Sequence, residues 1–381
     1  FTLNKGLLIN VISLIVLFTS IYGASLLRVE NSFISYFKSD TEIYKGMKLI
    51  DEKLGGTTPL DIIIKFPKDE NENELEELDS ELFDEYERTD ADWFTIEKIN
   101  TIKQAHDYLD AQPEIGKVLS LASTIRVAER INDGEELSSL EMGLLYKRAP
   151  EKVKQIAVNP YVSIGDNEAR INVRVLDSRE DLRRKELIER INRDLESKLK
   201  LDPSMFTVTG ILILYNNMLQ SLFNSQILSL GFVMLGITIM FLVLFKSFTL
   251  SLIGIIPNLL AATFVLGLMG LIGIPLDMMT ITVAAITVGI AVDNSIHYIY
   301  RFREEFEKQK NYEDALKASH NSIGRAIFFT SVTIIFGFSI LVLSNFIPTI
   351  IFGVLTGLAM LIAMIAVLTL LPKLILTIRP F

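Results

Sequence analysis

A carboxylate and an imidazole lie inside an otherwise apolar run, TVGIAVDNSIHYIY, at residues 287–300. Spacing of four residues places Gly289, Asp293 and His297 on one face of a helix, and Asn294 follows the carboxylate directly. A charged side chain within the bilayer costs roughly 2.5 to 3.5 kcal/mol on the gentlest scale, so it usually has a function. A carboxyl group that alternates between sealed and hydrated surroundings can take up and release a proton. The run therefore predicts a proton-coupling site at Asp293.

Hydroxyl groups of a later apolar run, FFTSVTIIFGF, are candidate partners for Asp293. Thr330, Ser331 and Thr333 can each donate a hydrogen bond to a carboxylate without carrying a charge. Hydroxyls in membrane helices also often bond only to their own backbone. His297 could relay the proton, or it could simply belong to the aromatic belt at the interface. These residues leave both questions open.

Helix packing near the carboxylate has its own signals. Gly289 has no side chain, so we expect a neighbouring backbone to approach there and to shield Asp293 from lipid. Pro257 and Asn258 interrupt another apolar run, where proline removes a helical hydrogen bond and can bend the helix. A bent helix beside an ionisable one fits a moving transporter, although it also occurs in membrane proteins that do not move. The alternative role for Asp293 is structural, holding helices together through hydrogen bonds.

Six apolar stretches of the chain reach the roughly 20 residues that a membrane span requires. One precedes and five follow a segment of mixed polarity, so we expect a first span within 1–27, a soluble domain at 28–226 and a five-helix membrane domain at 227–381. The first stretch is long for a signal peptide, which favours a retained span. Because the chain of 381 residues begins with Phe1, we expect it to be part of something longer. The predicted spans lie at 7–27, 227–245, 250–273, 278–299, 326–343 and 350–371.

The soluble segment shows strand and helix patterns that fit an α+β domain. Residues 60–66, 117–123, 169–176 and 206–209 have strand character, and in 169–176 apolar and polar side chains alternate. Apolar residues recur at helical spacing within 95–111 and 187–199. Helices between strands in both halves predict a ferredoxin-like sandwich.

Two further features of this segment have plain interpretations. Residues 69–90 contain twelve acidic side chains and one arginine, which favours an exposed loop over a metal site because no ligand spacing is regular. His106 is expected on a helix surface rather than as a ligand. The sequence contains no nucleophile elbow, phosphate loop or zinc signature, so neither an enzyme nor a cofactor-binding protein is predicted.

The charge distribution gives an orientation and excludes one class of partner. Residues 1–225 carry 28 basic and 39 acidic side chains, whereas the remainder carries 9 and 7, so nucleic acid is not an expected partner. Lysine and arginine flank the spans only at alternate connections, six of them between spans four and five. By the positive-inside rule both termini face the cytoplasm and the soluble domain lies outside it, in the periplasm of a bacterium. The chain has no cysteine, so disulfides and thiol chemistry are excluded.

Several motifs resemble one family of transporters. IIPNLL at 255–260, GIPLDMMT at 273–280, GIAVDNSIHYIYRFREE at 289–305 and GRAIFFTSVTIIFGF at 324–338 are similar to the MMPL or HpnN-like exporter branch of the resistance-nodulation-division (RND) superfamily. GGTTPLDIII at 55–64 and TGILILYNNMLQSLFNSQ at 209–226 extend the resemblance into the soluble segment. It covers nearly the whole chain.

The resemblance implies a membrane α-helical fold, a six-span half-unit of an RND transporter with an inserted α+β, ferredoxin-like porter domain. It also implies export of hydrophobic or amphiphilic, lipid-like molecules across or out of the inner (cytoplasmic) membrane, driven by protons that Asp293 binds. Relatives often follow this aspartate with tyrosine, whereas Asn294 stands here, which leaves the pairing of Asp293 open. Full-length members have twelve spans, so the expected partner is an N-terminal half of the same protein or a second copy.

Two other functions remain open on these residues. A SecD/SecF-like accessory of protein export shares the six-span unit and a similar GxxVD motif, although the Ser-Ile-His continuation favours the exporter. A sterol-sensing or lipid-sensing module that does not pump would keep the fold but would need no proton uptake. Proton movement through Asp293 is therefore the property that separates these functions.

Overall fold

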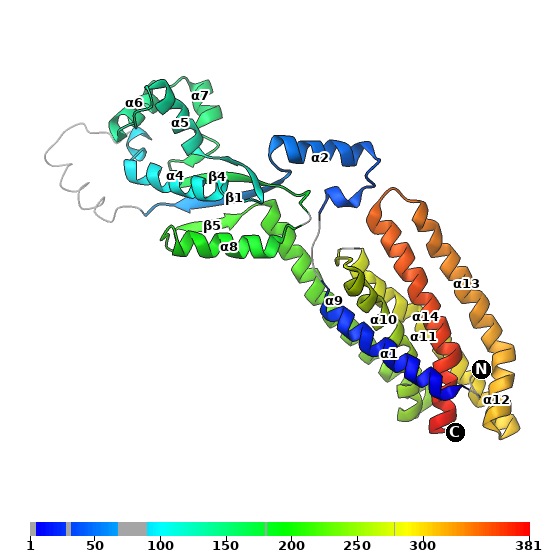
Figure 1. Ribbon diagram of the computed structural model, residues 1–381. Helices are drawn as coiled ribbons and strands as arrows, with labels where there is room; N and C mark the ends of the chain where they lie inside the picture. The colour runs from blue at the N-terminus through cyan, green and yellow to red at the C-terminus, as the bar shows by residue number, and fades with distance from the viewer. Residues whose placement is uncertain (1–4, 28–31, 68–89, 180, 278) are drawn as a thin grey trace. The chain divides into compact units, whose positions relative to one another are not determined.

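The computed structural model describes residues 5–27, 32–67, 90–179, 181–277 and 279–381 (Figure 1). It divides into two compact units, one made of Phe1–Thr41 with Met218–Phe381 and the other of Glu42–Asn217. The acidic segment predicted as a loop at 69–90 lies, apart from Asp90, outside the described residues.

The membrane unit contains helices long and apolar enough to span a bilayer, and six of them occur within the described residues. Each predicted span overlaps one of these helices. The spans at 227–245 and 350–371 lie wholly inside one, whereas the other four extend beyond a helix end. Two helices continue well past the apolar run, because the flanking YNNMLQSLFNSQ and RFREEFEKQ segments contain no helix-breaking Pro or Gly. The helices are α1 (Gly6–Ser25), α9 (Ile211–Phe245), α10 (Phe248–Ile272), α11 (Val283–Gln309), α13 (Arg325–Ser339) and α14 (Ile347–Ile378).

Three of these helices form the centre of the bundle. More than half of the most apolar stretch of each of α10, α11 and α14 is buried, whereas the corresponding stretches of α1, α9 and α13 are mostly uncovered among the described residues. Short elements connect or flank the spans: η1 (Ile34–Tyr36), η3 (Thr280–Thr282), α12 (Tyr312–Ser319), a π-helical turn at His320–Gly324 and η5 (Ile340–Leu343). Because the outer helices present so much apolar surface, this unit is built to be surrounded by lipid or by further protein.

Small residues allow α1 and α10 to cross in direct backbone contact. A Cβ atom added to Gly267 would collide with the backbone of Ser20, and one added to Gly23 would collide with the backbone of Gly267. Gly270 meets the carbonyl group of Gly23 in the same way. Such small-residue crossings let van der Waals contacts hold helices together in lipid, where no hydrophobic driving force acts between them.

The soluble unit is an antiparallel sheet with helices packed on it. The strand order is β2-β4-β1-β5, with the two-residue β3 paired to β4, and all pairs are antiparallel. The order of the main elements along the chain, β1-α4-β2-β4-α8-β5, gives the predicted ferredoxin-like topology. The elements are β1 (Thr58–Lys65), α4 (Ile96–Asp110), β2 (Ile115–Leu119), β3 (Val162–Ser163), β4 (Glu168–Val175), α8 (Arg184–Ser197) and β5 (Phe206–Thr209).

Alternation in the strands explains the core of this sheet. Leu60, Ile62 and Ile64 of β1 point to the buried face, opposite Ile171 and Val173 of β4. Apolar residues of α4 and α8 cover them. The predicted strand at 117–123 was wrong at its end, because Ser120 accepts a hydrogen bond from the Ala122 amide and starts a helix there.

A helical insert follows β2 and separates the two halves of the ferredoxin-like unit (Figure 1). It consists of α5 (Leu121–Ile131), α6 (Ser139–Arg148) and α7 (Glu151–Ala157). The remaining elements are α2 (Glu42–Leu54), which precedes β1, and η2 (Asp90–Trp93), which precedes α4.

The turn between α2 and β1 is fixed by a buried carboxylate. Asp51 accepts hydrogen bonds from the amide and hydroxyl of Thr57, at 2.8 and 2.7 Å, and from the amides of Asp177 and Ser178, at 3.0 and 2.8 Å. Burial by itself would raise the pKa of Asp51, but the hydrogen bonds from Ser178, Thr57 and Asp177 outweigh it and lower the pKa. Within the GGTT motif, Gly56 adopts φ +107°, where a Cβ atom would meet the Val175 carbonyl group at 2.6 Å.

We expect the substitution Asp51→Asn to lower the free energy of unfolding by about 1–3 kcal/mol, because an amide cannot accept all of these bonds. A folded-state pKa below the ordinary value of 3.8 means that the carboxylate stabilises the fold above that pH. This stabilisation disappears as the pH falls through the lowered pKa. Urea unfolding of the wild type and the variant, measured at several pH values, should therefore give curves that converge in acid. A constant difference at every pH would contradict this account.

Candidate functional site

The predicted stripe on α11 faces away from the rest of the chain. The side chain of Asp293 is 71% exposed and that of His297 is 59% exposed, whereas Asn294 and Ser295 are buried on the opposite face. The helix thus presents a polar stripe outward and packs its other side into the bundle.

Asp293 and His297 are brought together as their spacing predicted. His297 Nε2 lies 3.3 Å from Asp293 Oδ1, one helical turn away. A protonated imidazole at this distance would form an ion pair with the carboxylate. The two side chains are therefore close enough to act on each other, and their role in proton coupling stays a prediction.

The three candidate hydroxyls of α13 do not donate to Asp293 in the part of the chain that the structure describes. Thr330 Oγ1 donates to the carbonyl groups of Ala326 and Ile327, at 3.0 and 3.1 Å. Thr333 Oγ1 donates to the carbonyl group of Phe329 at 2.9 Å. Ser331 is buried, and its Oγ atom has no hydrogen-bond partner among the described residues. Their assistance to Asp293 stays a prediction.

The buried face of α11 is joined to α10 by an amide. Asn258 Nδ2 donates to the Gly254 carbonyl group at 2.9 Å and to Ser295 Oγ at 3.2 Å. Pro257 lies inside α10, which continues as a helix on both sides of it. A bend of α10 at Pro257 stays a prediction. The link between α10 and α11 is made by Asn258 and by Ser295, which the sequence analysis did not single out.

The expected shielding of Asp293 at Gly289 is not provided by the residues that the structure describes. A Cβ atom added to Gly289 would find nothing within 4 Å among the described residues. The space beside the carboxylate is therefore open toward whatever surrounds α11.

A second polar network, which the sequence analysis missed, joins three segments of the membrane unit. His320 Nε2 lies 3.0 Å from the Leu368 carbonyl oxygen, and His320 Nδ1 lies 2.8 Å from the hydroxyl of the buried Tyr298. Leu368 lacks its helical donor because the residue four positions later is Pro372, which has no N–H group. The carbonyl oxygen can only accept, so His320 Nε2 donates to it, and Nδ1 shares a hydrogen bond with the Tyr298 hydroxyl. The only signal for this contact in the sequence was Pro372, which leaves a carbonyl group of its own helix without a donor.

We expect the substitution His320→Ala to lower the free energy of unfolding by about 1–3 kcal/mol for each partner that it leaves without a hydrogen bond. The thermal unfolding midpoint of the detergent-solubilised protein measures the loss. His297→Ala is the matched control, because that imidazole is exposed and should leave the midpoint unchanged. Equal effects of the two substitutions would show that the network does not hold α11, α14 and the π-helical turn together.

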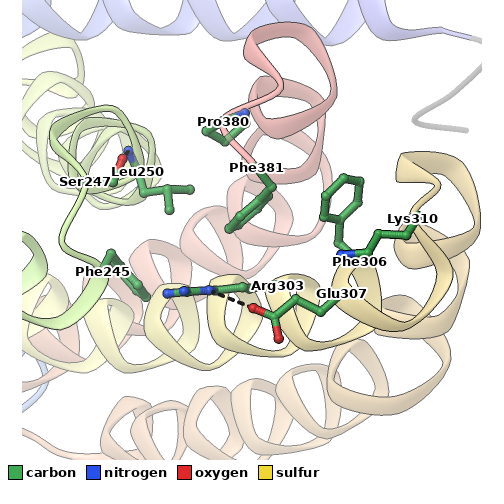
Figure 2. A pocket seen from close by; sticks show the side chains of 9 residues that line it. All are labelled: Phe245, Ser247, Leu250, Arg303, Phe306, Glu307, Lys310, Pro380 and Phe381. Carbon is green, nitrogen blue, oxygen red and sulfur yellow. Dashed lines mark hydrogen bonds and ion pairs between the residues drawn. The ribbon is translucent and has the colours of Figure 1, made fainter.

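A recess lies where the ends of α9, α11 and α14 meet the start of α10 (Figure 2). Its volume is about 340 Å³, and Arg303, Glu307 and Lys310 supply its charges. Figure 2 shows the ion pair between Arg303 and Glu307, whose N···O distance is 3.3 Å. Because this pair neutralises itself, Lys310 supplies the remaining charge among the side chains that line the recess.

Metal binding finds no support in the described residues, where no group of three or more His, Asp or Glu side chains could hold an ion. The expectation that His106 lies on a helix surface was wrong. This residue is buried on the inner face of α4, where its Nδ1 atom lies 2.9 Å from Ser120 Oγ. Burial, aided by the nearby Arg126, lowers the pKa of His106 and keeps the ring neutral.

The comparison with protein families decides the class of this molecule. The model of the MMPL family matches residues 36–381. The chain belongs to the MMPL family. It is also similar to a protein of Methanocaldococcus jannaschii named "Putative membrane protein MJ1562", with 25% identity over 386 residues that cover 98% of this chain and 91% of that protein.

Membership in the MMPL family, within the RND superfamily, agrees with the architecture. The chain is a transporter-like membrane protein whose helical unit is interrupted by an α+β domain after the first span. Both the matched range and the similarity to the archaeal relative include α11, so the Asp293 stripe lies within the region that defines the family relationship.

Proposed function

We propose that this MMPL protein uses the proton-motive force to export hydrophobic or amphiphilic, lipid-like molecules, and that Asp293 is its proton-binding group. The observation that carries the proposal is the outward position of a carboxylate on a membrane-spanning helix. An ionisable side chain that costs several kcal/mol in lipid usually has a function. Proton uptake and release is a function that Asp293 and the neighbouring His297 are chemically able to perform.

A second six-span unit covers the Asp293 stripe in this proposal. The face that contains Gly289 and Asp293 is open in the single chain, and lipid contact with an ionised carboxylate is unfavourable. The covering unit is either an N-terminal half of the same protein or a second copy of this chain. The archaeal relative supports the second copy, because this chain spans 91% of its length and leaves no room there for another six-span unit.

Protonation of Asp293 is proposed to move α11 and, through it, the helices connected to the soluble domain. The Asn258–Ser295 hydrogen bond links α11 to α10, which is in backbone contact with α1. Helix α1 leads into the soluble domain, and α9 leaves it directly after β5. A change in the charge of Asp293 changes the stability of the helix packing around it. Because α1 and α9 connect the membrane unit covalently to the soluble domain, we propose that they transmit this change.

The orientation of the exporter follows the basic residues. Arg301 and Arg303 at the end of α11 are proposed to face the cytoplasm, with both termini on that side. The soluble domain then lies on the extracytoplasmic side of the cytoplasmic membrane, where it would receive cargo.

Reconstitution tests the function directly. The full-length gene product in proteoliposomes, under an imposed pH gradient, should move protons faster when a lipid-like cargo such as a fluorescent fatty acid is added. A protonophore that collapses the gradient should stop cargo movement. Cargo movement that persists without the gradient would rule out proton coupling, and the absence of any proton flux would favour the sensing or protein-export functions.

A further inference from the structure

A pocket lies among the three helices of the insert in the soluble unit, α5, α6 and α7. Its volume is about 290 Å³, and Phe94 together with side chains from the three helices forms its walls. Most of these walls are aliphatic or aromatic, among them Leu121 and Ile125 of α5 and Met142 and Leu145 of α6. A concave, apolar pocket with few polar groups is the usual form of a small-molecule site.

The polar groups at this pocket are few and mostly engaged. Thr124 Oγ1 donates to the Ala157 carbonyl group at 2.7 Å and thereby ties α5 to α7. The Tyr146 ring lies between Phe94, at a centroid distance of 4.8 Å, and Lys154 Nζ, at 4.5 Å from its centroid. Apart from Thr124, Arg148 and the Tyr146 hydroxyl, the side chains that line the pocket are apolar, so they suit an alkyl chain.

One cation lies at the rim. Arg148, at the end of α6, lines the pocket, is exposed to solvent, and forms no ion pair with any other described residue. The neighbouring Lys154 is held 3.9 Å from Glu151. Arg148 therefore supplies the charge complementarity for an anionic group, and its planar guanidinium suits a carboxylate or phosphate.

The insert also exposes aliphatic side chains that do not line the pocket. Leu145, which lines the pocket, is 50% exposed, and Ile131 and Leu140 nearby in sequence are 81% and 83% exposed. The pocket is concave, and the charge of Arg148 at its rim distinguishes it from a flat apolar contact.

We propose that this pocket binds the alkyl chain of a single-chain anionic amphiphile, such as a long-chain carboxylate, whose head group pairs with Arg148. The volume is near the lower end of the roughly 300–1,000 Å³ of ligand pockets, which suits one chain and not a two-chain phospholipid. The inference rests on the proposed export of amphiphiles and names the chemical class of a cargo and a place where the soluble domain holds it.

The chain carries its own reporter for this site. Trp93 is the only tryptophan in the sequence, and its ring centroid lies 5.3 Å from that of Phe94, which lines the pocket. Titration of the full chain in nanodiscs with cis-parinaric acid, a fluorescent fatty acid, should give saturable energy transfer from Trp93. Oleate should displace the probe, and oleyl alcohol should displace it less well because it lacks the charge.

Two pairs of variants test the walls and the rim. Leu145→Glu should weaken cis-parinarate binding by at least about tenfold, because the new carboxylate loses hydration and repels the ligand, whereas Leu140→Glu outside the pocket should not change it. Arg148→Gln should weaken carboxylate binding and leave the affinity for the alcohol unchanged, with Lys147→Gln as its control. Because Leu145 and Arg148 are exposed to solvent, these variants should fold.

The outcomes separate this inference from the export mechanism. Absence of saturable energy transfer in the wild type, or equal effects of Leu145→Glu and Leu140→Glu, would overturn the pocket assignment. If Leu145→Glu instead dissociates a dimer of a protein that binds no probe, the surface is an interface between copies and the proposal is wrong. Asp293→Asn should bind the probe like the wild type, so binding without proton flux would refute only the coupling, and flux without binding would refute only the pocket.

Discussion

Replacement of Asp293 by asparagine is expected to reduce cargo-stimulated proton flux by about a hundredfold or more, the usual consequence of losing an essential acid–base group. The amide nearly preserves the shape of the side chain but cannot titrate. Because the side chain is 71% exposed within this chain and its contact is with His297, the unfolding midpoint of the solubilised protein should stay unchanged. Proton flux in proteoliposomes and thermal unfolding of the same preparation measure the two effects.

Asp293→Glu serves as the matched variant, since it keeps a titratable carboxyl and should retain part of the flux. His297→Gln separates the relay from the carrier, because it removes the imidazole beside the carboxylate while Asp293 still titrates. Equal flux in the wild type and in Asp293→Asn, or a large loss of stability in that variant, would show that the carboxylate holds helices together and that another group carries the proton.

The second large effect is expected at the crossing of α1 and α10, where Gly267→Leu should destabilise the membrane unit by about 3 kcal/mol or more. The position of a Cβ atom at Gly267 is already occupied by the backbone of Ser20, so the two helices must separate to admit a side chain. Loss of this contact also removes the packing that connects α10 to the helix leading into the soluble domain. The fraction of folded protein after extraction, and its unfolding midpoint, measure the effect.

Gly236→Leu is the matched control for this substitution. Gly236 lies in α9, also within a membrane span, and an added Cβ atom meets nothing within 4 Å there. The control should therefore fold like the wild type. If both leucine variants behave alike, backbone contact between α1 and α10 is not what holds the first span to the bundle.

The sequence predicted those features that follow from local periodicity. Helical spacing correctly placed Asp293 and His297 on one stripe, and the alternation within residues 169–176 correctly predicted the strand β4. The strand, helix and strand of the second half appear as β4, α8 and β5. These patterns can be predicted because the helix or strand to which a residue belongs determines which way its side chain faces.

Features that depend on tertiary contacts could not be predicted from the sequence. His106 has the helical spacing of the buried Ile102 and Leu109, but its hydrogen-bonding partner, Ser120, lies on another segment that this spacing does not identify. The His320 contact requires a carbonyl group that Pro372 leaves free on a helix almost fifty residues away in sequence. The crossing at Gly267 requires knowledge of which two helices meet. No rule based on a single segment supplies such information.

The most direct test of the account is the lipid exposure of the Asp293 stripe in the assembled protein. Because the chain has no cysteine, Gly289→Cys can carry a single spin label whose collision rate with oxygen, which dissolves in lipid, is measured by electron paramagnetic resonance in bilayers. Phe336→Cys on the exposed side of α13 provides the comparison. The account predicts a label at position 289 that is protected from oxygen, because a second six-span unit covers it, and a label at position 336 that is more exposed. Equal and high accessibility at both positions would show that the stripe faces lipid, and it would contradict the proposed coupling surface.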